Sequence, residues 1–313
     1  MANLTENAKA YLEAFYSGPK IESFDPIEFK ALQAQAPVAP QNNLPSIHQT
    51  EDRSIKAQDG QDIRIRIYTP EGEGPFPALV YYHGGGWVIG SIEMFEGANR
   101  LIAMEGKVVV VSVDYRLAPE HPYPTPIEDC YAALEWVAAN AEEINVNPAR
   151  ISVGGDSAGG NLATVIAKKA LDQNGPAIQS QVLVYPVTNL EFTTDSYKEF
   201  AEGFGLDIHL MRWFGKHYLS DATQAGEPDV SPLKYDSVKG LPPAIIIAAE
   251  NDVLKDEGVA YAEKLKQDGV HVQYELIPGV IHAYYSNLMF FEEETKQSVQ
   301  HIVKFLNKVE QTI

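Results

Sequence analysis

The stretch "ISVGGDSAGG", residues 151–160, joins an apolar segment to a helical one through a serine set between glycines. The run before it has the composition of a buried strand, and residues 160–172 follow helical spacing. The pattern G-x-S-x-G over Gly155–Gly159 is typical of a strained strand-to-helix turn whose glycines let both elements close around the serine. A serine in an ordinary tight turn is the simpler alternative, so the pattern alone only nominates Ser157.

Apolar runs elsewhere in the chain predict a parallel sheet around this stretch. Strands covered on both faces must be almost wholly apolar, and five segments are: 76–83, 107–115, 150–156, 180–186 and 243–252. Segments with helical spacing alternate with them: 126–141, 160–172, 256–268 and 292–309. This alternation predicts the α/β class, with a mostly parallel, doubly wound central sheet flanked by helices.

The remaining segments complete this architecture. Residues 61–70 alternate apolar and polar side chains, which predicts an antiparallel edge strand with one solvated face, and residues 271–279 predict a last strand. Residues 1–45 are helical and then proline-rich, and residues 188–235 are aromatic and too long for a loop without structure of its own. We expect a single domain over residues 1–313, in which these two regions form a helical cap over the strand ends.

Composition and charge argue against several classes of function. The 313 residues include 24 Lys and Arg against 43 Asp and Glu, a formal net charge of −19 that should repel nucleic acids and anionic lipid surfaces. No apolar run has the length of a membrane span or the form of a secretory signal. The single cysteine, Cys130, precludes an internal disulfide and fits the cytoplasm. Because nucleotide- and metal-binding motifs are missing, we expect no cofactor and no metal.

A nucleophilic serine needs a general base, and position separates the eight histidines. Seven of them lie in a linker, in residues 188–235, in other loops, at a strand start or within a helix. His282 follows the last predicted strand, where a loop at the carboxyl end of the sheet can reach Ser157. His282 is therefore the predicted base.

An acidic residue must orient that base, and the chain order expected on this architecture is serine, acid, histidine. Asp252 fits, since it follows a buried strand at its carboxyl end and lies between Ser157 and His282 in the sequence. Glu250 could still be within the strand end. Asp256 and Glu257 could be first-turn residues of the next helix, where the helix dipole favours them. Asp252 is the predicted acid.

A second glycine-rich stretch, "YYHGGGWVIGS" at residues 81–91, follows the strand 76–83. Attack by a serine on a carbonyl group places negative charge on oxygen, and N–H donors must be ready to meet it. Glycines let the backbone approach a ligand without intervening side chains. We therefore predict that this loop supplies the donors, together with the N–H of Ala158.

Taken in order, these motifs make the chain resemble the hormone-sensitive-lipase-like group of α/β-hydrolases, bacterial esterase family IV. The matching segments, found between residues 60 and 310, are "HGGGWVIGS", "VDYRLAPEHPYP", "GDSAGGNLA", "DVLKDEG" and "IHAY". The resemblance implies the α/β-hydrolase fold with a helical cap and a triad of Ser157, Asp252 and His282. It also implies cofactor-free hydrolysis of short- to medium-chain carboxylic esters through an acyl-enzyme intermediate.

The same resemblance carries expectations about finer features. It implies an oxyanion hole formed by the N–H groups of Gly85, Gly86 and Ala158. Many members of the group have glycine and phenylalanine after the histidine, where this chain has Ala283 and Tyr284, a difference that concerns local packing rather than the base. Homodimers are common among the relatives, so the resemblance favours a homodimer.

Four aromatic residues are candidates for binding the substrate: Trp87, Tyr185, Phe204 and Phe214. Aromatic residues are equally the usual filling of a small helical cap, and the sequence leaves both interpretations open. Other reactive side chains are interpreted as structural: His83 beside the glycines, Arg116, Glu120 and His121 in a rigid loop, and Cys130 on an apolar helix face.

The predicted function is that of a serine carboxylesterase acting on a small-molecule ester. A non-catalytic binding protein is the alternative from another class, because plant gibberellin receptors resemble this family but have lost the catalytic histidine. The presence of His282 argues against it. Amidase, deacetylase and lactonase activities share the tetrahedral intermediate, and fold analogy does not separate them.

Overall fold

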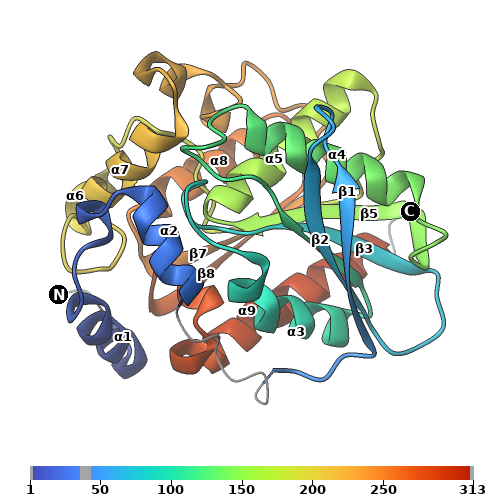
Figure 1. Cartoon of the computed structure of the whole chain (residues 1–313), viewed down its shortest axis with the longest axis horizontal. Helices are drawn as coiled ribbons and strands as arrows, with labels where there is room; N and C mark the ends of the chain where they lie inside the picture. Colours follow the sequence, from blue (N-terminus) through green and yellow to red (C-terminus); the bar gives the residue numbers. More distant parts are fainter. Residues whose placement is uncertain (1–2, 36–43, 311–313) are drawn as a thin grey trace.

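The computed structural model describes residues 3–35 and 44–310. Residues 36–43, which belong to the first predicted cap region, lie outside the described residues. The described chain forms an eight-stranded sheet in the order β1-β2-β4-β3-β5-β6-β7-β8. Figure 1 shows this twisted sheet through the middle of the molecule with helices on both faces, which confirms the predicted α/β class.

The strands are mostly parallel. From β4 to β8 every neighbouring pair is parallel, whereas β2 is antiparallel to both β1 and β4. The strands are β1 (Gln49–Lys56), β2 (Asp62–Thr69), β3 (Phe76–Tyr82), β4 (Val109–Asp114), β5 (Val146–Asp156), β6 (Gln181–Val184), β7 (Ala244–Asn251) and β8 (Val272–Ile281). Strands β3, β4, β6 and β7 and the part of β5 from Ile151 to Asp156 are almost wholly buried, as expected for strands with helices on both sides. Residues 147–150 of β5 are partly or fully exposed.

The prediction that residues 61–70 form an edge strand is wrong, because β1 lies outside β2. The two strands pair antiparallel along their whole length, from Gln49 opposite Thr69 to Lys56 opposite Asp62. Only Ile55 of β1 is buried, so this strand has no apolar periodicity from which it could be recognised.

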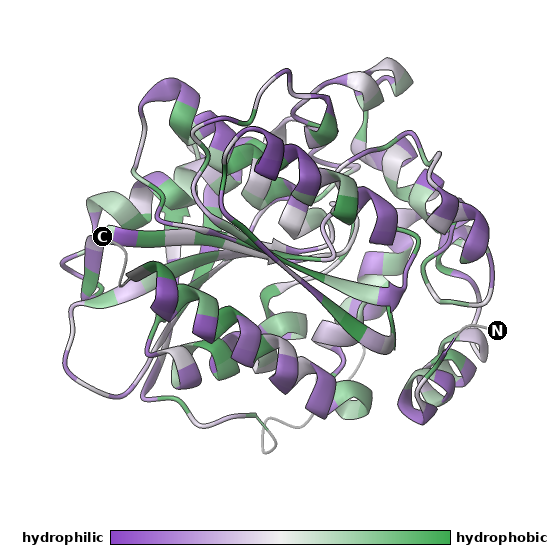
Figure 2. Cartoon of the chain, turned by 180° about the vertical axis from the view of Figure 1, so that it is seen from behind, coloured by the Kyte–Doolittle hydropathy of each residue, from purple (hydrophilic) through white to green (hydrophobic). Residues whose placement is uncertain are grey.

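Two layers of helices cover the sheet. Helices α3 (Glu96–Gly106) and α9 (Leu288–Glu310) lie on one face, and α4 (Thr125–Ala139), α5 (Ala158–Gln173) and α8 (Lys255–Gln267) lie on the other. Helix α3 was not expected from the sequence. It is short, it has a glycine near each end, and its start has no side-chain cap. In Figure 2 the strands are mostly hydrophobic, whereas the helices carry hydrophilic residues on their outer sides.

Four further helices gather at one end of the molecule (Figure 1). They are α1 (Glu6–Tyr16), α2 (Pro26–Gln35), α6 (Asp195–Glu199) and α7 (Ile208–Tyr218). Two of them begin at side-chain caps: the Thr5 hydroxyl accepts a hydrogen bond from the N–H of Ala8, and the Asp207 carboxylate accepts from His209 and Leu210. Among the described helices, none combines the length and the apolar composition required to span a bilayer.

Candidate active site

The predicted serine turn joins β5 directly to α5. Ser157 has a φ of 54° and a ψ of −119°, a strained conformation for a residue with a side chain. A Cβ atom added to Gly155 or Gly159 would overlap the carbonyl oxygen of Tyr82 on the neighbouring strand. The two glycines therefore let strand and helix approach closely enough to hold Ser157 in its strained turn.

Ser157, His282 and Asp252 form one hydrogen-bonded chain. Nε2 of His282 lies 2.9 Å from Oγ of Ser157, and Nδ1 lies 2.7 Å from Oδ2 of Asp252. An ionised carboxylate only accepts, so Nδ1 carries the hydrogen of the neutral ring and Nε2 is free to accept from the serine hydroxyl. All three side chains are buried. The arrangement allows the imidazole to take the serine proton while the carboxylate holds the ring.

Sheet topology explains why these residues meet. Ser157, Asp252 and His282 each follow the last residue of a strand, namely β5, β7 and β8. These strands are part of one parallel array, so their carboxyl ends share an edge of the sheet. Residues up to 125 positions apart in the sequence are thereby brought within hydrogen-bonding distance.

The other carboxylates considered for the acid are engaged elsewhere. Glu250 lies within β7, and its side chain accepts a hydrogen bond from the N–H of Gly279 at 2.7 Å. Asp256 accepts from the N–H of Ser196 at 2.7 Å. Glu257 accepts from the N–H groups of Thr188 and Asn189, as described below.

The loop of Gly84, Gly85 and Gly86 lies beside Ser157 and lines the same cavity. Gly85 and Gly86 have φ values of 118° and 59°, which favour glycine. A Cβ on Gly85 would overlap the carbonyl of Ile89, and one on Gly86 would overlap the ring of Phe214. Within the described residues, the N–H groups of Gly85 and Gly86 donate no hydrogen bond, so both remain available to a ligand.

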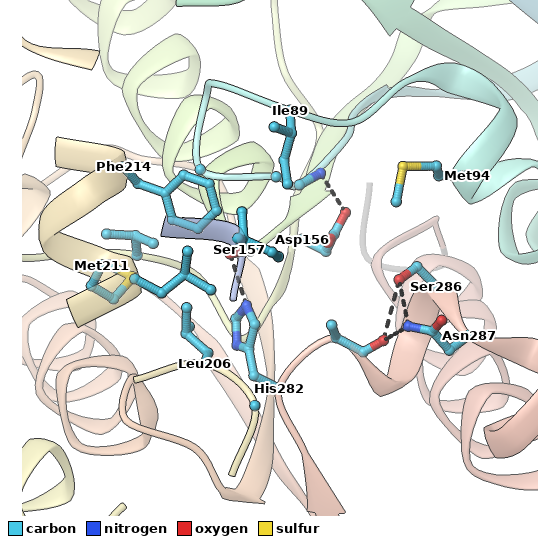
Figure 3. A pocket seen from close by; sticks show the side chains of 18 of the residues that line it. Ile89, Met94, Asp156, Ser157, Leu206, Met211, Phe214, His282, Ser286 and Asn287 are labelled. Carbon is cyan, nitrogen blue, oxygen red and sulfur yellow. Dashed lines mark hydrogen bonds between the residues drawn. The ribbon is translucent and has the colours of Figure 1, made fainter. Parts of the chain in front are cut away.

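A cavity of about 230 Å³ opens onto Ser157 and His282. In Figure 3, Leu206, Met211 and Phe214 lie on one side of this pair, and Met94, Ser286 and Asn287 lie on the other. The helices at the end of the sheet contribute much of the wall: Tyr11 and Phe15 from α1, Gln33 from α2, and Leu210, Met211 and Phe214 from α7.

The four predicted pocket aromatics divide into two pairs. Trp87 and Phe214 line the cavity. Tyr185 lies against His282, with its ring centroid 4.5 Å from that of the histidine, and Phe204 packs edge-on against Phe200. Neither Tyr185 nor Phe204 belongs to the described lining of the cavity.

Comparisons with known proteins agree with this geometry. A family profile of the α/β-hydrolase fold matches residues 79–286. Carboxylesterase NlhH of Mycobacterium tuberculosis is 40% identical over 266 residues, which are 83% of this chain and 82% of the relative. The chain belongs to the hormone-sensitive-lipase-like esterases of the α/β-hydrolase fold. Its enzyme class is therefore that of the carboxylic ester hydrolases.

Solved structures resemble this esterase over nearly its full length. A hyperthermophilic esterase from the archaeon Pyrobaculum calidifontis superposes with a TM-score of 0.91 at 38% identity, covering 99% of both chains. One of two fungal esterases from Rhizomucor miehei superposes with a TM-score of 0.93 at 35% identity, covering 100% of this chain and 98% of the other.

Asp156 is a site residue that sequence reasoning missed. Its Oδ1 accepts hydrogen bonds from the N–H of Gly84 at 2.9 Å and from the hydroxyl of Tyr81 at 2.8 Å (Figure 3 shows the first). Burial raises the pKa of this carboxyl to about 7, against the opposing effect of the Tyr81 hydrogen bond. Asp156 thus ties the glycine loop of the esterase to the turn that holds Ser157.

The side chains interpreted as structural have structural partners. Nδ1 of His83 lies 2.7 Å from the carbonyl oxygen of Gly84, and burial lowers the pKa of this histidine. Arg116 donates to the buried Asp129 at 2.8 and 2.6 Å. Cys130 is buried, which raises the pKa of its thiol well above the usual value. The described residues contain no group of three or more metal-ligating side chains.

Proposed function

We propose that this protein is a serine carboxylesterase in which Ser157 is the nucleophile, His282 the general base and acid, and Asp252 the residue that orients His282. The observation that carries the proposal is the chain of two hydrogen bonds, 2.7 and 2.9 Å long, which ends at a serine facing the cavity. A buried, oriented imidazole beside a strained serine is the arrangement that covalent acyl transfer requires.

Acylation of the enzyme begins when Oγ of Ser157 attacks the ester carbonyl carbon and Nε2 of His282 takes the hydroxyl proton. The carbonyl π electrons move to oxygen and give a tetrahedral oxyanion. When this intermediate collapses, the bond to the alcohol oxygen breaks, and His282 returns the proton to the departing alcohol. A water molecule, deprotonated by His282, then attacks the acyl-enzyme, which releases the carboxylic acid and restores Ser157.

We propose that the N–H groups of Gly85, Gly86 and Ala158 stabilise the oxyanion. The first two N–H groups donate to no described residue, and the loop that carries them lies beside Ser157. Ala158 is the first residue of α5, so its N–H is at the positive end of the helix dipole. Donors held in place before the reaction require no reorganisation when the charge develops.

We propose that α1 and α2, from the first predicted cap region, and residues 188–235 form a cap that admits small, uncharged esters of short- to medium-chain acids. Apolar side chains from α1 and α7 face the cavity, which suits an acyl chain. No lysine or arginine is among the described residues that line the cavity, so the wall offers no cation to an anionic substrate. The net charge of −19 would also repel such a substrate.

The test is hydrolysis of p-nitrophenyl butyrate by the wild type and by Ser157→Ala. Removal of the nucleophile should lower kcat by about a millionfold, because the other two residues act only through it. Ser237→Ala, which removes an exposed serine hydroxyl bonded to Asp268, should retain full activity. Turnover by Ser157→Ala at the wild-type rate would contradict the proposal.

A fluorophosphonate probe separates an esterase from a protein that only binds esters. The probe should form a covalent bond to Ser157 of the wild type and should not label Ser157→Ala. A binding protein with an unreactive serine would remain unlabelled in both forms. A series of p-nitrophenyl esters of increasing acyl length would then measure the preferred chain.

A further inference from the structure

Residues 188–230, the part of the second cap region that carries α6 and α7, are called the 188–230 segment. A single side chain holds both ends of this segment. Asn161 lies in the first turn of α5, is fully buried, and comes four residues after Ser157. Its Nδ2 group donates to the carbonyl oxygen of Val187 at 3.0 Å and to that of Val230 at 3.0 Å. One amide group therefore holds together the start and the end of the segment that carries α6 and α7 (Figure 1).

The start of this segment is also bonded to the backbone of the serine turn. The carbonyl oxygen of Ser157 accepts hydrogen bonds from the N–H of Val187 at 3.1 Å and from the N–H of Asn161 at 3.0 Å. Val187 lines the cavity. Ser157, Val187 and Asn161 are thus hydrogen-bonded to one another, and these bonds fix the start of the segment relative to Ser157.

Further hydrogen bonds join the two ends into a stem. The N–H of Leu233 donates to the carbonyl of Thr188 at 3.0 Å, and the hydroxyl of Ser231 accepts from the N–H of Leu190 at 2.9 Å. On the other side, Glu257 of α8 accepts from the N–H of Thr188 at 2.7 Å. Both ends of the segment are therefore rigid, although the cavity is lined by residues further along it.

The side-chain amide of Asn161 combines two hydrogen bonds with one polar atom that has no partner among the described residues. Its Oδ1 is buried and accepts no hydrogen bond from the described residues. A buried amide oxygen without a partner is unfavourable, and an apolar residue of similar volume would avoid it. What only the amide provides is a pair of N–H donors that can reach two carbonyl groups at once.

We infer that Asn161 is a positioning residue for the acyl-binding side of the site: it sets the distance between Ser157 and the 188–230 segment, and so determines which acyl chains are accepted. The inference rests on the proposed esterase function. Leu206, Leu210, Met211 and Phe214, all from this segment, line the cavity next to Val187. Small displacements of such residues change the fit of a methylene group, which a hydrophobic pocket discriminates by about 10- to 200-fold.

The experiment compares p-nitrophenyl acetate with p-nitrophenyl hexanoate in the wild type and in Asn161→Ala. The acetyl group barely extends toward the cap, so kcat/KM for acetate should change little. The ratio of kcat/KM for hexanoate to that for acetate should change by about tenfold or more, mainly through KM. The rate of labelling by a small fluorophosphonate should stay close to that of the wild type, since the chain of Ser157, His282 and Asp252 is untouched.

The matched control is Thr164→Val, one turn further along α5. Thr164 is also fully buried, and its hydroxyl donates at 3.1 Å to the carbonyl of Gly160 in the same helix, without reaching the cap. This variant should keep the wild-type ratio. If Asn161→Ala does not fold, Ser231→Ala, which removes the acceptor for the N–H of Leu190, should change the ratio in the same direction to a smaller extent.

An unchanged hexanoate-to-acetate ratio in the folded variant, with both rates falling in parallel or only the melting temperature lowered, would overturn the inference. Hydrolysis by the wild type separates this outcome from a failure of the proposed function. If the wild type hydrolyses neither ester, the proposed function is wrong and the inference fails with it. If the wild type is active and the variant keeps its ratio, only the role of Asn161 is wrong.

Discussion

The two sides of the cavity are built by different kinds of contact. On the sheet side, the hydrogen-bond ladders of parallel strands place Ser157, Asp252 and His282. The strained backbone of Ser157 and the hydrogen bond between His282 and Asp252 add to this placement. On the cap side, much of the wall consists of apolar side chains from α1 and α7, which belong to helices and not to the strand ladder.

This difference separates the requirements of chemistry from those of substrate choice. Transition-state stabilisation depends on donors placed to within fractions of an ångström, and a strand ladder provides that rigidity. Acyl recognition depends on shape, which apolar side chains on a helix can alter without disturbing the ladder. Substitutions on the sheet side should therefore change kcat, and substitutions in the cap or its stem should change selectivity or stability.

The largest effect is expected for Gly86→Ala, on the sheet side. Alanine at a φ of 59° is strained, and its Cβ would overlap the ring of Phe214, so the loop must move. Displacing a proposed oxyanion donor should lower kcat by about 100- to 1000-fold, whereas backbone strain and the overlap together should lower the free energy of unfolding by about 2–5 kcal/mol.

Gly60→Ala is the matched control for that substitution. Gly60 also has a positive φ, 84°, but nothing lies within 4 Å of an added Cβ. It should lose only the part of the stability that comes from backbone strain, about 1–2 kcal/mol, with unchanged turnover. Equal losses of kcat in the two variants, measured on p-nitrophenyl butyrate, would mean that Gly86 serves only to turn the loop.

An intermediate effect is expected for Asp156→Ala, which cuts the tie between the glycine loop and the serine turn. The buried donors of Tyr81 and Gly84 would both lose their acceptor. A loss of about 1–3 kcal/mol in positioning corresponds to roughly a 5- to 150-fold decrease in kcat, with KM nearly unchanged.

Two conservative variants sharpen the prediction for Asp156. Asp156→Asn retains an acceptor oxygen and should keep most of the activity. Tyr81→Phe removes one of the two donors to Asp156 and leaves the hydrogen bond from Gly84. Its decrease in kcat should therefore be smaller than that of Asp156→Ala. Equal kcat values for Asp156→Ala and Asp156→Asn would show that the two hydrogen bonds do not position the loop.

The smallest effect, on stability rather than turnover, is expected for Glu257→Gln in the stem of the cap. Burial raises the pKa of this carboxyl to about 8, above an ordinary value of about 4.3 in the unfolded chain. Between these two values the folded protein holds a proton that the unfolded chain has released, so this group lowers stability as the pH rises.

Glutamine cannot titrate, and its Oε1 can still accept from the N–H groups of Thr188 and Asn189. The melting temperature of Glu257→Gln relative to the wild type should therefore rise by about 5–10 °C between pH 5 and pH 8, since the two pKa values correspond to roughly 3–4 kcal/mol over this range. Glu263→Gln, an exposed position on the same helix, serves as the control and should show no such trend. If the melting temperatures of Glu257→Gln and the wild type differ by the same amount at both pH values, Glu257 does not titrate differently in the folded and unfolded states over this range.

The order of the motifs was sufficient to nominate the three residues that the structure brings together. Each motif marks the end of a strand: glycines beside a serine, a carboxylate after one buried strand, and a histidine after the next. The carboxyl ends of parallel strands meet at one edge of the sheet, so these residues were expected to lie together. Strand β1 was missed, because the burial of a single residue leaves little periodicity to detect. Helix α3 was missed although its buried apolar residues recur at helical spacing.

Contacts over long sequence distances were beyond prediction. Asp156 lies inside the recognised G-x-S-x-G pattern, yet its partners are 72 and 75 residues away. Asn161 lies in a quoted motif as well, but its role depends on carbonyl groups 26 and 69 residues further along. Likewise, Trp87 and Tyr185 were equal candidates for the pocket until packing placed one at the cavity wall and the other against His282.

Local sequence patterns were enough to predict the parallel α/β architecture and the strained serine turn, because periodicity and the steric limits of glycine act between near neighbours. The folded structure was needed to show which side chains tie the glycine loop to that turn, which aromatic residues face the cavity, and how residues 188–230 are joined to Ser157. Those outcomes depend on the packing of whole elements, where a hydrogen bond forms only if distant backbone segments arrive at the right distance.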